Sequence, residues 1–231
     1  MSEEQPKYNE DEVHLYSVLS EASYKRGNNA KQKLIDEEGL IGYDLLPETS
    51  REALVVETPD DKIIIAYRGT DFSNQQAGKW GDLGTDGFLA MGLGTLTPRY
   101  RRADKKYKQV KEKYPGKKII FTGHSLGSFL AVELSKKHEK DEIETHVFNM
   151  GSSHITARKG FMDRIFQHKR VKKQKQRIKH YYIPGDVISV FGSAGDPSIT
   201  HVAIKKNPEV RGSGVLHRHN IQHFKKRRHS I

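Results

Sequence analysis

The sequence has no cysteine and no long apolar run. Without cysteine among its 231 residues, the chain can form neither a disulfide bond nor a thiol nucleophile. No stretch approaches the roughly 18 consecutive apolar residues of a membrane-spanning helix, and the mean hydropathy of −0.75 is that of a polar, soluble protein. Residues 1–6 are polar and acidic, unlike a secretory signal peptide. These absences lead us to expect an intracellular protein.

Positive charge is abundant but unevenly placed. The chain carries a net charge of +11, whereas Arg164–Ile231 alone holds sixteen Lys and Arg against three acidic residues, a local charge of +13. The densest runs are 169–177 and Lys225–Arg228. Such a field favours an anionic partner, which could be a lipid surface, a nucleic acid or an acidic protein. The cluster at 225–228 also has the composition of a nuclear import signal, and the alternative is a basic surface that only aids solubility.

One decapeptide carries most of the chemical information. The apolar segment that begins at Ile119 runs into Gly123-His124-Ser125-Leu126-Gly127, and the apolar helix pattern of 129–134 follows. A strand, a Gly-x-Ser-x-Gly turn and a helix in this order form a nucleophile elbow, in which the serine hydroxyl is exposed by a strained turn. Ser125 is therefore the predicted nucleophile, and His124 is expected to pack the elbow rather than to act as the base.

A serine nucleophile needs an acid and a base, which follow it in the chain in hydrolases built on this elbow. The predicted acid is Asp186, in the turn of Pro184-Gly185-Asp186 directly after an apolar strand, where active-site residues of parallel sheets collect. Asp196 is the weaker rival.

The predicted base is His219. It precedes Ile221 and Phe224, which could anchor a short helix that holds the imidazole over the serine. His217 and His223 stand close by and stay open as alternatives, because spacing alone cannot separate three neighbouring histidines.

The developing oxyanion needs preorganised donors. One is the backbone N–H of Leu126, at the start of the helix after the elbow. The second is expected from the end of an earlier strand, 66–71, where Thr70 offers an amide and a hydroxyl.

The pattern of the whole chain predicts a single domain over 1–231. Apolar runs at 53–58 and 62–67 flank a Pro-Asp-Asp turn and indicate a hairpin. Further strands are predicted at 119–122, 144–150, 178–183 and 200–204, and helices at about 9–26, 100–114 and 158–170. The Gly-rich stretch 71–97 is expected to be irregular, and the basic tail of about 207–231 likewise. Strands that alternate with helices favour a mostly parallel α/β sheet covered on both faces.

Tyr67-Arg68-Gly69-Thr70, followed by the elbow, resembles the fungal-type (class 3) lipases of the α/β-hydrolase superfamily. The resemblance covers roughly residues 50–190. It implies an α/β-hydrolase fold, Thr70 as an oxyanion donor, and a lid at 71–97, for which a long surface loop is the alternative. The chain departs from the family in lacking disulfides, in the Val-Ile-Ser that follows Asp186, and in a histidine region without a clear match.

Two hypotheses of function follow. The first is a serine hydrolase that cleaves acylglycerol or phospholipid esters through Ser125, His219 and Asp186, with Thr70 and Leu126 holding the oxyanion. It needs no cofactor, and no His-Glu-x-x-His motif or other zinc signature is present. The second is a catalytically silent hydrolase fold that binds nucleic acid or another anionic surface. Aromatic residues are not interleaved with the basic run, as stacking on single strands would require.

Overall fold

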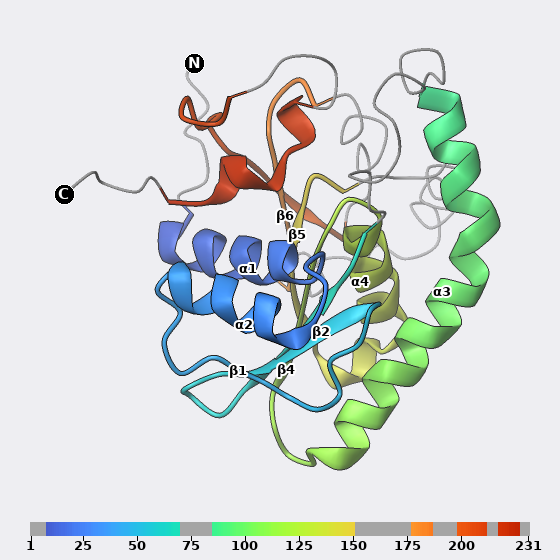
Figure 1. Cartoon of the computed structure of the whole chain (residues 1–231). Helices are drawn as coiled ribbons and strands as arrows, with labels where there is room; N and C mark the ends of the chain where they lie inside the picture. Colours follow the sequence, from blue (N-terminus) through green and yellow to red (C-terminus); the bar gives the residue numbers. More distant parts are fainter. Residues whose placement is uncertain (1–7, 70–84, 151–176, 187–197, 212–216, 227–231) are drawn as a thin grey trace.

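A seven-stranded sheet forms the centre of the described part of the chain (Figure 1). The computed structural model describes residues 8–69, 85–150, 177–186, 198–211 and 217–226, with the backbone alone for 85–97. The strands are β1 (Asp44–Leu45), β2 (Ala53–Glu57), β3 (Ile63–Tyr67), β4 (Ile119–His124), β5 (Glu144–Phe148), β6 (Ile178–Tyr182) and β7 (Thr200–Ala203).

Strand order in the sheet follows the order in the sequence, β1 to β7. β1, β2 and β3 pair antiparallel, whereas every later pairing, from β3–β4 to β6–β7, is parallel. The register aligns Tyr67 with Gly123, and His124 with Phe148, which in turn pairs with Tyr181. The carboxyl ends of β3 to β6 therefore lie along one edge, where parallel sheets place their active sites.

Helices cover both faces of the sheet, as the sequence predicts. They are α1 (Glu10–Ala22), α2 (Asn28–Glu37), α3 (Thr85–Lys113) and α4 (Leu126–Lys137), with short 3-10 helices η2 (Glu139–Asp141), η3 (His217–His219) and η4 (Ile221–Phe224). Side chains alternate along each strand, so that Val55, Ile65 and Phe121 meet α3 and α4. Their neighbours on the opposite face meet α1, α2 and η4.

The N-terminal and C-terminal segments therefore share one face. In Figure 1 the red C-terminal segment lies against α1, and η4 packs on this helix. Asn9 caps α1 by accepting the N–H groups of Asp11 and Glu12, and acidic residues fill the first turn, which suits the helix dipole. The helix ends at Ala22, earlier than the predicted residue 26.

Two elements differ from the sequence-based expectation. α3 begins at Thr85 and contains Pro98, so the prediction of an irregular segment up to 97 is wrong for 85–97. Proline removes one backbone hydrogen bond but does not require the chain before it to be non-helical. The helix α2 was not predicted, because lysine, glutamine, aspartate and glutamate make up half of it and it buries little.

Several expectations fall outside the described residues. These are Thr70, Asp196, the helix at 158–170 and the part of the lid candidate that precedes α3. Among the residues that the structure does describe, none of the helices combines the length and apolar character needed to cross a bilayer.

Candidate active site

Ser125 occupies a strained turn between β4 and α4. Its φ of 59° and ψ of −124° lie in a region that few non-glycine residues adopt. The turn is tight because its flanking glycines have no side chain. A Cβ on Gly123 would lie 2.6 Å from the carbonyl carbon of Gly127, and a Cβ on Gly127 would overlap the carbonyl oxygen of Tyr67. This is the geometry of a nucleophile elbow, as the sequence predicts.

The polar groups at the elbow are arranged for chemistry at the serine oxygen. Ser125 is buried, and its Oγ has no hydrogen-bond partner among the residues described here. Its own N–H is engaged with the carbonyl oxygen of Phe148 at 3.1 Å. Leu126 is the first residue of α4, where backbone N–H groups have no acceptor within the helix and the dipole is positive. The amide of Leu126 is thus available to an oxyanion.

The structure brings Asp186 and His219 together across 33 residues of sequence. Nδ1 of His219 donates to Oδ2 of Asp186 at 2.9 Å. Both are buried, Asp186 completely and His219 with 4% exposure. Asp186 stands in the turn after β6, where Gly185 has a φ of 81°. Because Nδ1 is committed to the carboxylate, Nε2 is the nitrogen that can take up a proton.

The other candidate bases, His217 and His223, contact each other. Nε2 of His223 donates to the carbonyl oxygen of His217 at 3.0 Å, and the two rings pack edge to face with centroids 5.0 Å apart. Burial lowers the pKa of His223. These contacts join His217 and His223 to each other, whereas the carboxylate of Asp186 is joined to His219.

Burial keeps the imidazole of His124 neutral, and this ring contacts the backbone of His219. Its pKa is lowered to about 3 by burial and by the neighbouring His219. Nε2 lies 2.7 Å from the carbonyl oxygen of His219, which can only accept, so Nε2 carries the proton. The hydroxyl of Tyr24 lies 3.2 Å from the carbonyl oxygen of His124. His124 is therefore a packing residue of the elbow, as expected, and Tyr24 is a supporting residue that the sequence did not reveal.

In the sequence, Gly69 is the residue that could have indicated a close contact such as that with Tyr24. A Cβ on Gly69 would lie 2.6 Å from the carbonyl oxygen of His124 and would overlap the hydroxyl of Tyr24. The guanidinium of Arg68 lies 5.8 Å from the ring of the same tyrosine. The Arg-Gly pair that follows β3 thus packs directly on Tyr24, which contacts the elbow residue His124.

One described cluster has the composition of a metal site but is already neutralised. Glu12, Glu144 and His146 place their ligand atoms within 4.8 Å of one another. However, Lys179 lies 3.0 Å from Glu12, and Lys118 lies 2.6 Å from Glu144. The two ammonium groups balance the charge of the carboxylates, so this cluster is an ion-pair network at the opposite end of the strands from Ser125.

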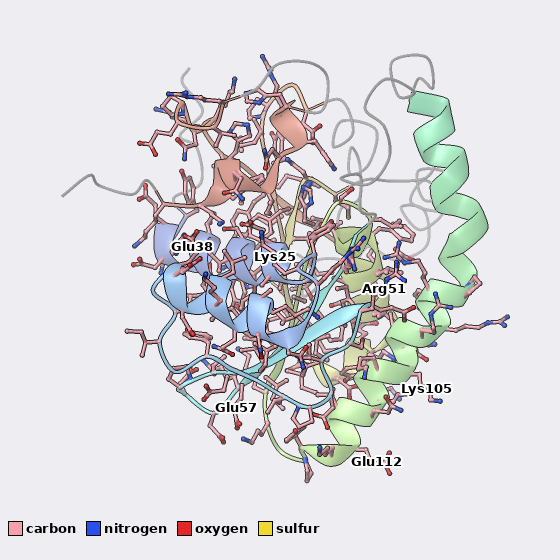
Figure 2. All side chains as sticks on the ribbon, in the orientation of Figure 1. Lys25, Glu38, Arg51, Glu57, Lys105 and Glu112 are labelled. Carbon is pink, nitrogen blue, oxygen red and sulfur yellow. The ribbon has the colours of Figure 1, made fainter. Side chains whose placement is uncertain are left out.

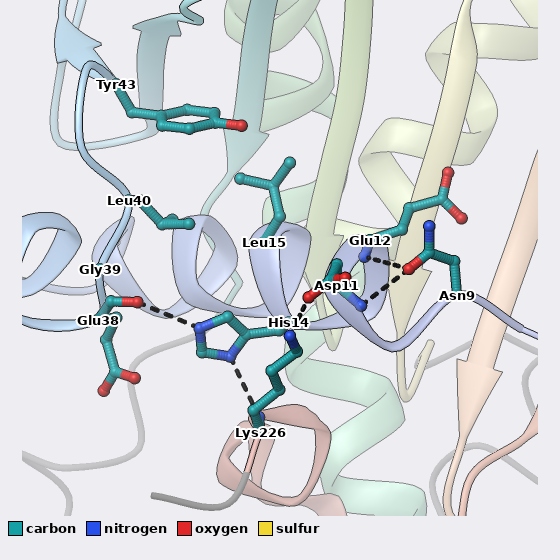
Figure 3. A pocket seen from close by; sticks show the side chains of 10 residues that line it. All are labelled: Asn9, Asp11, Glu12, His14, Leu15, Glu38, Gly39, Leu40, Tyr43 and Lys226. Atoms are coloured by element: carbon teal, nitrogen blue, oxygen red, sulfur yellow. Dashed lines mark hydrogen bonds and ion pairs between the residues drawn. The ribbon is translucent and has the colours of Figure 1, made fainter.

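A surface hollow of about 450 Å³ lies at the start of α1 (Figure 3). Its lining includes His14, which accepts the N–H of Lys226 at Nδ1 and therefore donates from Nε2 to the carbonyl oxygen of Glu38. None of the residues that line it belongs to the candidate triad. The hollow marks where the C-terminal segment meets α1 and the loop after α2.

Comparison with known families agrees with this geometry. The profile of Tle-like phospholipase domains, described as phospholipase-like, matches residues 17–220. The chain belongs to this family. The Tle-like phospholipase domain described here is accordingly a carboxylic ester hydrolase of the lipase and phospholipase type. The expected resemblance to lipases is confirmed at this level. No curated protein matches the sequence.

Solved structures agree on the fold. A point mutant of MDLA from Penicillium cyclopium is 12% identical with a TM-score of 0.52, and the match covers 88% of this domain and 82% of that chain. A deletion mutant in the lipase propeptide complex of Rhizomucor miehei is 17% identical with a TM-score of 0.51, covering 85% and 67%. At these identities the likeness confirms the predicted α/β-hydrolase fold of the Tle-like domain.

Proposed function

We propose that this chain, as one domain over 1–231, hydrolyses carboxylic esters of phospholipids or acylglycerols through a Ser125-His219-Asp186 triad. The observation that carries the proposal is the buried hydrogen bond between His219 and Asp186. Ser125 follows β4 directly, Asp186 lies in the turn after β6, and His124 at the end of β4 bonds the carbonyl oxygen of His219. The phospholipase family supports a lipid ester as the substrate.

The reaction follows from the roles of these atoms. Oγ of Ser125 attacks the ester carbonyl while Nε2 of His219 takes its proton, and Asp186 stabilises the imidazolium. The amide of Leu126 and Thr70 donate to the oxyanion. The tetrahedral intermediate then expels the alcohol, which leaves with the proton from His219. Water repeats the sequence on the acyl-enzyme, and the fatty acid is released. No metal or cofactor takes part in this scheme.

We further propose that the enzyme works at an anionic lipid surface. α3 turns several basic side chains outward, among them Arg101 and Lys105, and Lys105 projects from this helix in Figure 2. Each basic residue near an anionic surface adds on the order of 1 kcal/mol to binding. By contrast, Lys225 and Lys226 of the C-terminal cluster are bound to acidic residues of the N-terminal segment. The described part of that cluster therefore stabilises the contact between the C-terminal and N-terminal segments.

The proposed function is tested by esterase activity and active-site labelling together. Hydrolysis of p-nitrophenyl esters from butyrate to palmitate, and of vesicles of neutral or anionic phospholipid, is measured for the wild type. Ser125→Ala and His219→Asn should each lower kcat about 10⁴-fold or more, because triad residues act as a unit. Only the wild type and variants with an intact triad should react quickly with a fluorophosphonate. The chain-length profile distinguishes an esterase from a lipase.

His217→Asn is the matched control, since it removes a neighbouring histidine whose ring packs on His223. It should keep most of the activity. If His217→Asn were as inactive as His219→Asn, the assignment of the base would be wrong. A wild type that neither hydrolyses esters nor reacts with the fluorophosphonate would favour the silent, anion-binding module. Equal rates on neutral and anionic vesicles would refute the anionic interface.

A further inference from the structure

Asn149 stands directly after β5, between the acid and the base of the candidate triad. It is completely buried, and its φ of 42° lies in the left-handed region. Its backbone N–H donates to the carbonyl oxygen of Tyr181 at 3.0 Å, which extends the pairing of β5 with β6 by one residue. The backbone that carries the Asn149 side chain is therefore held in place by this hydrogen bond.

The amide group of Asn149 bonds to the acid side and the base side at once. Its Oδ1 accepts the N–H of Ile183 at 3.1 Å, in the segment that leads from β6 to Asp186. Its Nδ2 donates to the carbonyl oxygen of Arg218 at 3.0 Å, in the residue before His219. The identities of the two partners fix the orientation of the amide, because Ile183 offers a donor and Arg218 an acceptor.

We propose that Asn149 is a positioning residue that sets the distance between Asp186 and His219. This inference rests on the proposed function of the same site. The residue before it, Phe148, accepts the N–H of Ser125 through its carbonyl oxygen. Two consecutive residues at one strand end thus hold the segments of the nucleophile, the acid and the base. The end of β5 thereby fixes a catalytic geometry that must be held within a fraction of an ångström.

Asparagine suits this position for two physical reasons. Its side chain joins an acceptor and a donor on one planar group, so that one residue can bridge an N–H and a carbonyl. It also tolerates the left-handed backbone better than most residues. Aspartate keeps the shape but would set an acceptor against the carbonyl of Arg218. Glycine suits the backbone but removes both bonds.

A second contact supports the same alignment. The guanidinium of Arg218 donates to the carbonyl oxygen of Pro184 at 2.9 Å and covers Gly185, in the turn that carries Asp186. This contact lies at the surface, whereas the amide of Asn149 is buried. The buried bonds are therefore the ones expected to control the geometry, since water cannot replace them.

The kinetic test compares Asn149→Asp, Asn149→Ala and Asn149→Gly with the wild type. We expect kcat to fall about 10- to 100-fold in each variant while KM changes little, as a misplacement of about 1 Å has such an effect. The rate of fluorophosphonate labelling should fall in parallel. Ser135→Ala is the matched control, because Ser135 is also buried and bonds a backbone carbonyl, that of Ile143, but lies far along α4 from the elbow. It should lose stability and keep kcat.

If Asn149 served the fold alone, Asn149→Gly would keep kcat, since glycine accepts the backbone angle of this residue. That result would overturn the inference, as would a loss of kcat in Ser135→Ala equal to that in Asn149→Ala.

A spectroscopic readout separates this inference from the proposed function. The Nδ1 proton of His219, hydrogen-bonded to Asp186, should give a downfield proton resonance, assigned by its absence in His219→Asn. We expect the resonance to shift or broaden in Asn149→Ala and Asn149→Gly, whether or not the protein cleaves an ester. An unchanged resonance in both variants would overturn the inference. A wild type that shows the resonance but is inert to esters and fluorophosphonates would overturn the proposed function alone.

Discussion

Because Gly127 has no Cβ, helix α4 can approach the sheet closely. The Cα of this residue faces the carbonyl of Tyr67 at the end of β3, and no Cβ fits between them. The approach brings the first turn of α4, with the amide of Leu126, against the end of β3. A glycine is therefore needed for the expected oxyanion donor of α4 to lie at this edge of the sheet.

We accordingly predict that Gly127→Ala weakens both the fold and the reaction. Overpacking of this kind costs about 1–3 kcal/mol, and the shifted amide should lower kcat at least 10-fold. Gly116→Ala is the matched control, because Gly116 has a φ of 84° but open space around its Cα. It should cost about 1 kcal/mol and leave kcat unchanged. Urea denaturation and ester hydrolysis measure the two effects, and equal kcat values for both variants would contradict the role given to Gly127.

At the scale of elements, the segment that carries His219 is fastened to the N-terminal helices. Just after η4, Lys225 forms ion pairs with Glu21 of α1 and with Glu38 after α2, the latter at 2.8 Å. The Lys225 and Glu38 side chains are each only 8% exposed. Phe224 adds an apolar contact by packing edge to face on Phe148 of β5. The candidate base is thus held by elements far away in the sequence.

We predict that Lys225→Met destabilises the protein by about 3 kcal/mol, because it removes a largely buried ammonium group that pairs with two mostly shielded carboxylates. Lys226→Met is the control, since its pair with Asp11 is exposed to solvent and should contribute less than about 1 kcal/mol. Denaturant midpoints compare the two variants. Adding Glu21→Gln and Glu38→Gln to Lys225→Met should restore much of the loss. If Lys225→Met lost no more stability than Lys226→Met, the stabilising role given to the ion pairs of Lys225 would be contradicted.

At the scale of the whole molecule, two buried histidines couple stability to pH. Burial lowers the pKa of His124 to about 3 and that of His180 to about 3. Neighbouring histidines, His219 and His201, act in the same direction, whereas Asp186 opposes both shifts. Both groups are neutral in the folded protein at a pH where the unfolded chain, with an ordinary histidine pKa of 6.5, binds protons.

The sign of the effect follows from proton uptake on unfolding. Stability from these groups is complete above pH 6.5 and is lost as the pH falls towards the folded pKa of about 3. Each histidine should contribute a slope of about 1.4 kcal/mol per pH unit within this window. Urea denaturation followed by circular dichroism at several pH values measures the slope. His124→Asn and His180→Gln should each reduce it by about that amount, and an unchanged slope in both would refute the assignment.

The sequence predicted the parts of the candidate site whose signals are local. Ser125 was proposed from the strand, turn and helix around it, and Asp186 from its place after an apolar strand. Those two signals depend on backbone periodicity and turn chemistry, which a single sequence records. The choice of His219 over its neighbours depended on which ring would meet Asp186, and that is a contact between segments, not a local pattern.

The supporting residues were missed for the same reason. In the sequence, Tyr24 and Asn149 look like ordinary residues of a predicted helix and a predicted strand, and only the fold brings them to His124 and Arg218. The prediction starts this helix at residue 100 because a proline commonly marks a helix boundary, although a long helix can include a proline when its other hydrogen bonds persist.

The meeting of the N-terminal and C-terminal segments on α1 has a mechanical consequence. If tension is applied between Tyr8 and Lys226, the load reaches the contact of Lys226 with His14 first and the ion pairs of Lys225 next. These contacts would break one after another, whereas β4 shares its load across a full ladder of neighbouring strands. The segment that peels away carries His219. A small pulling force in this direction would therefore move the proposed base, His219, away from Ser125 while the sheet around Ser125 stayed intact.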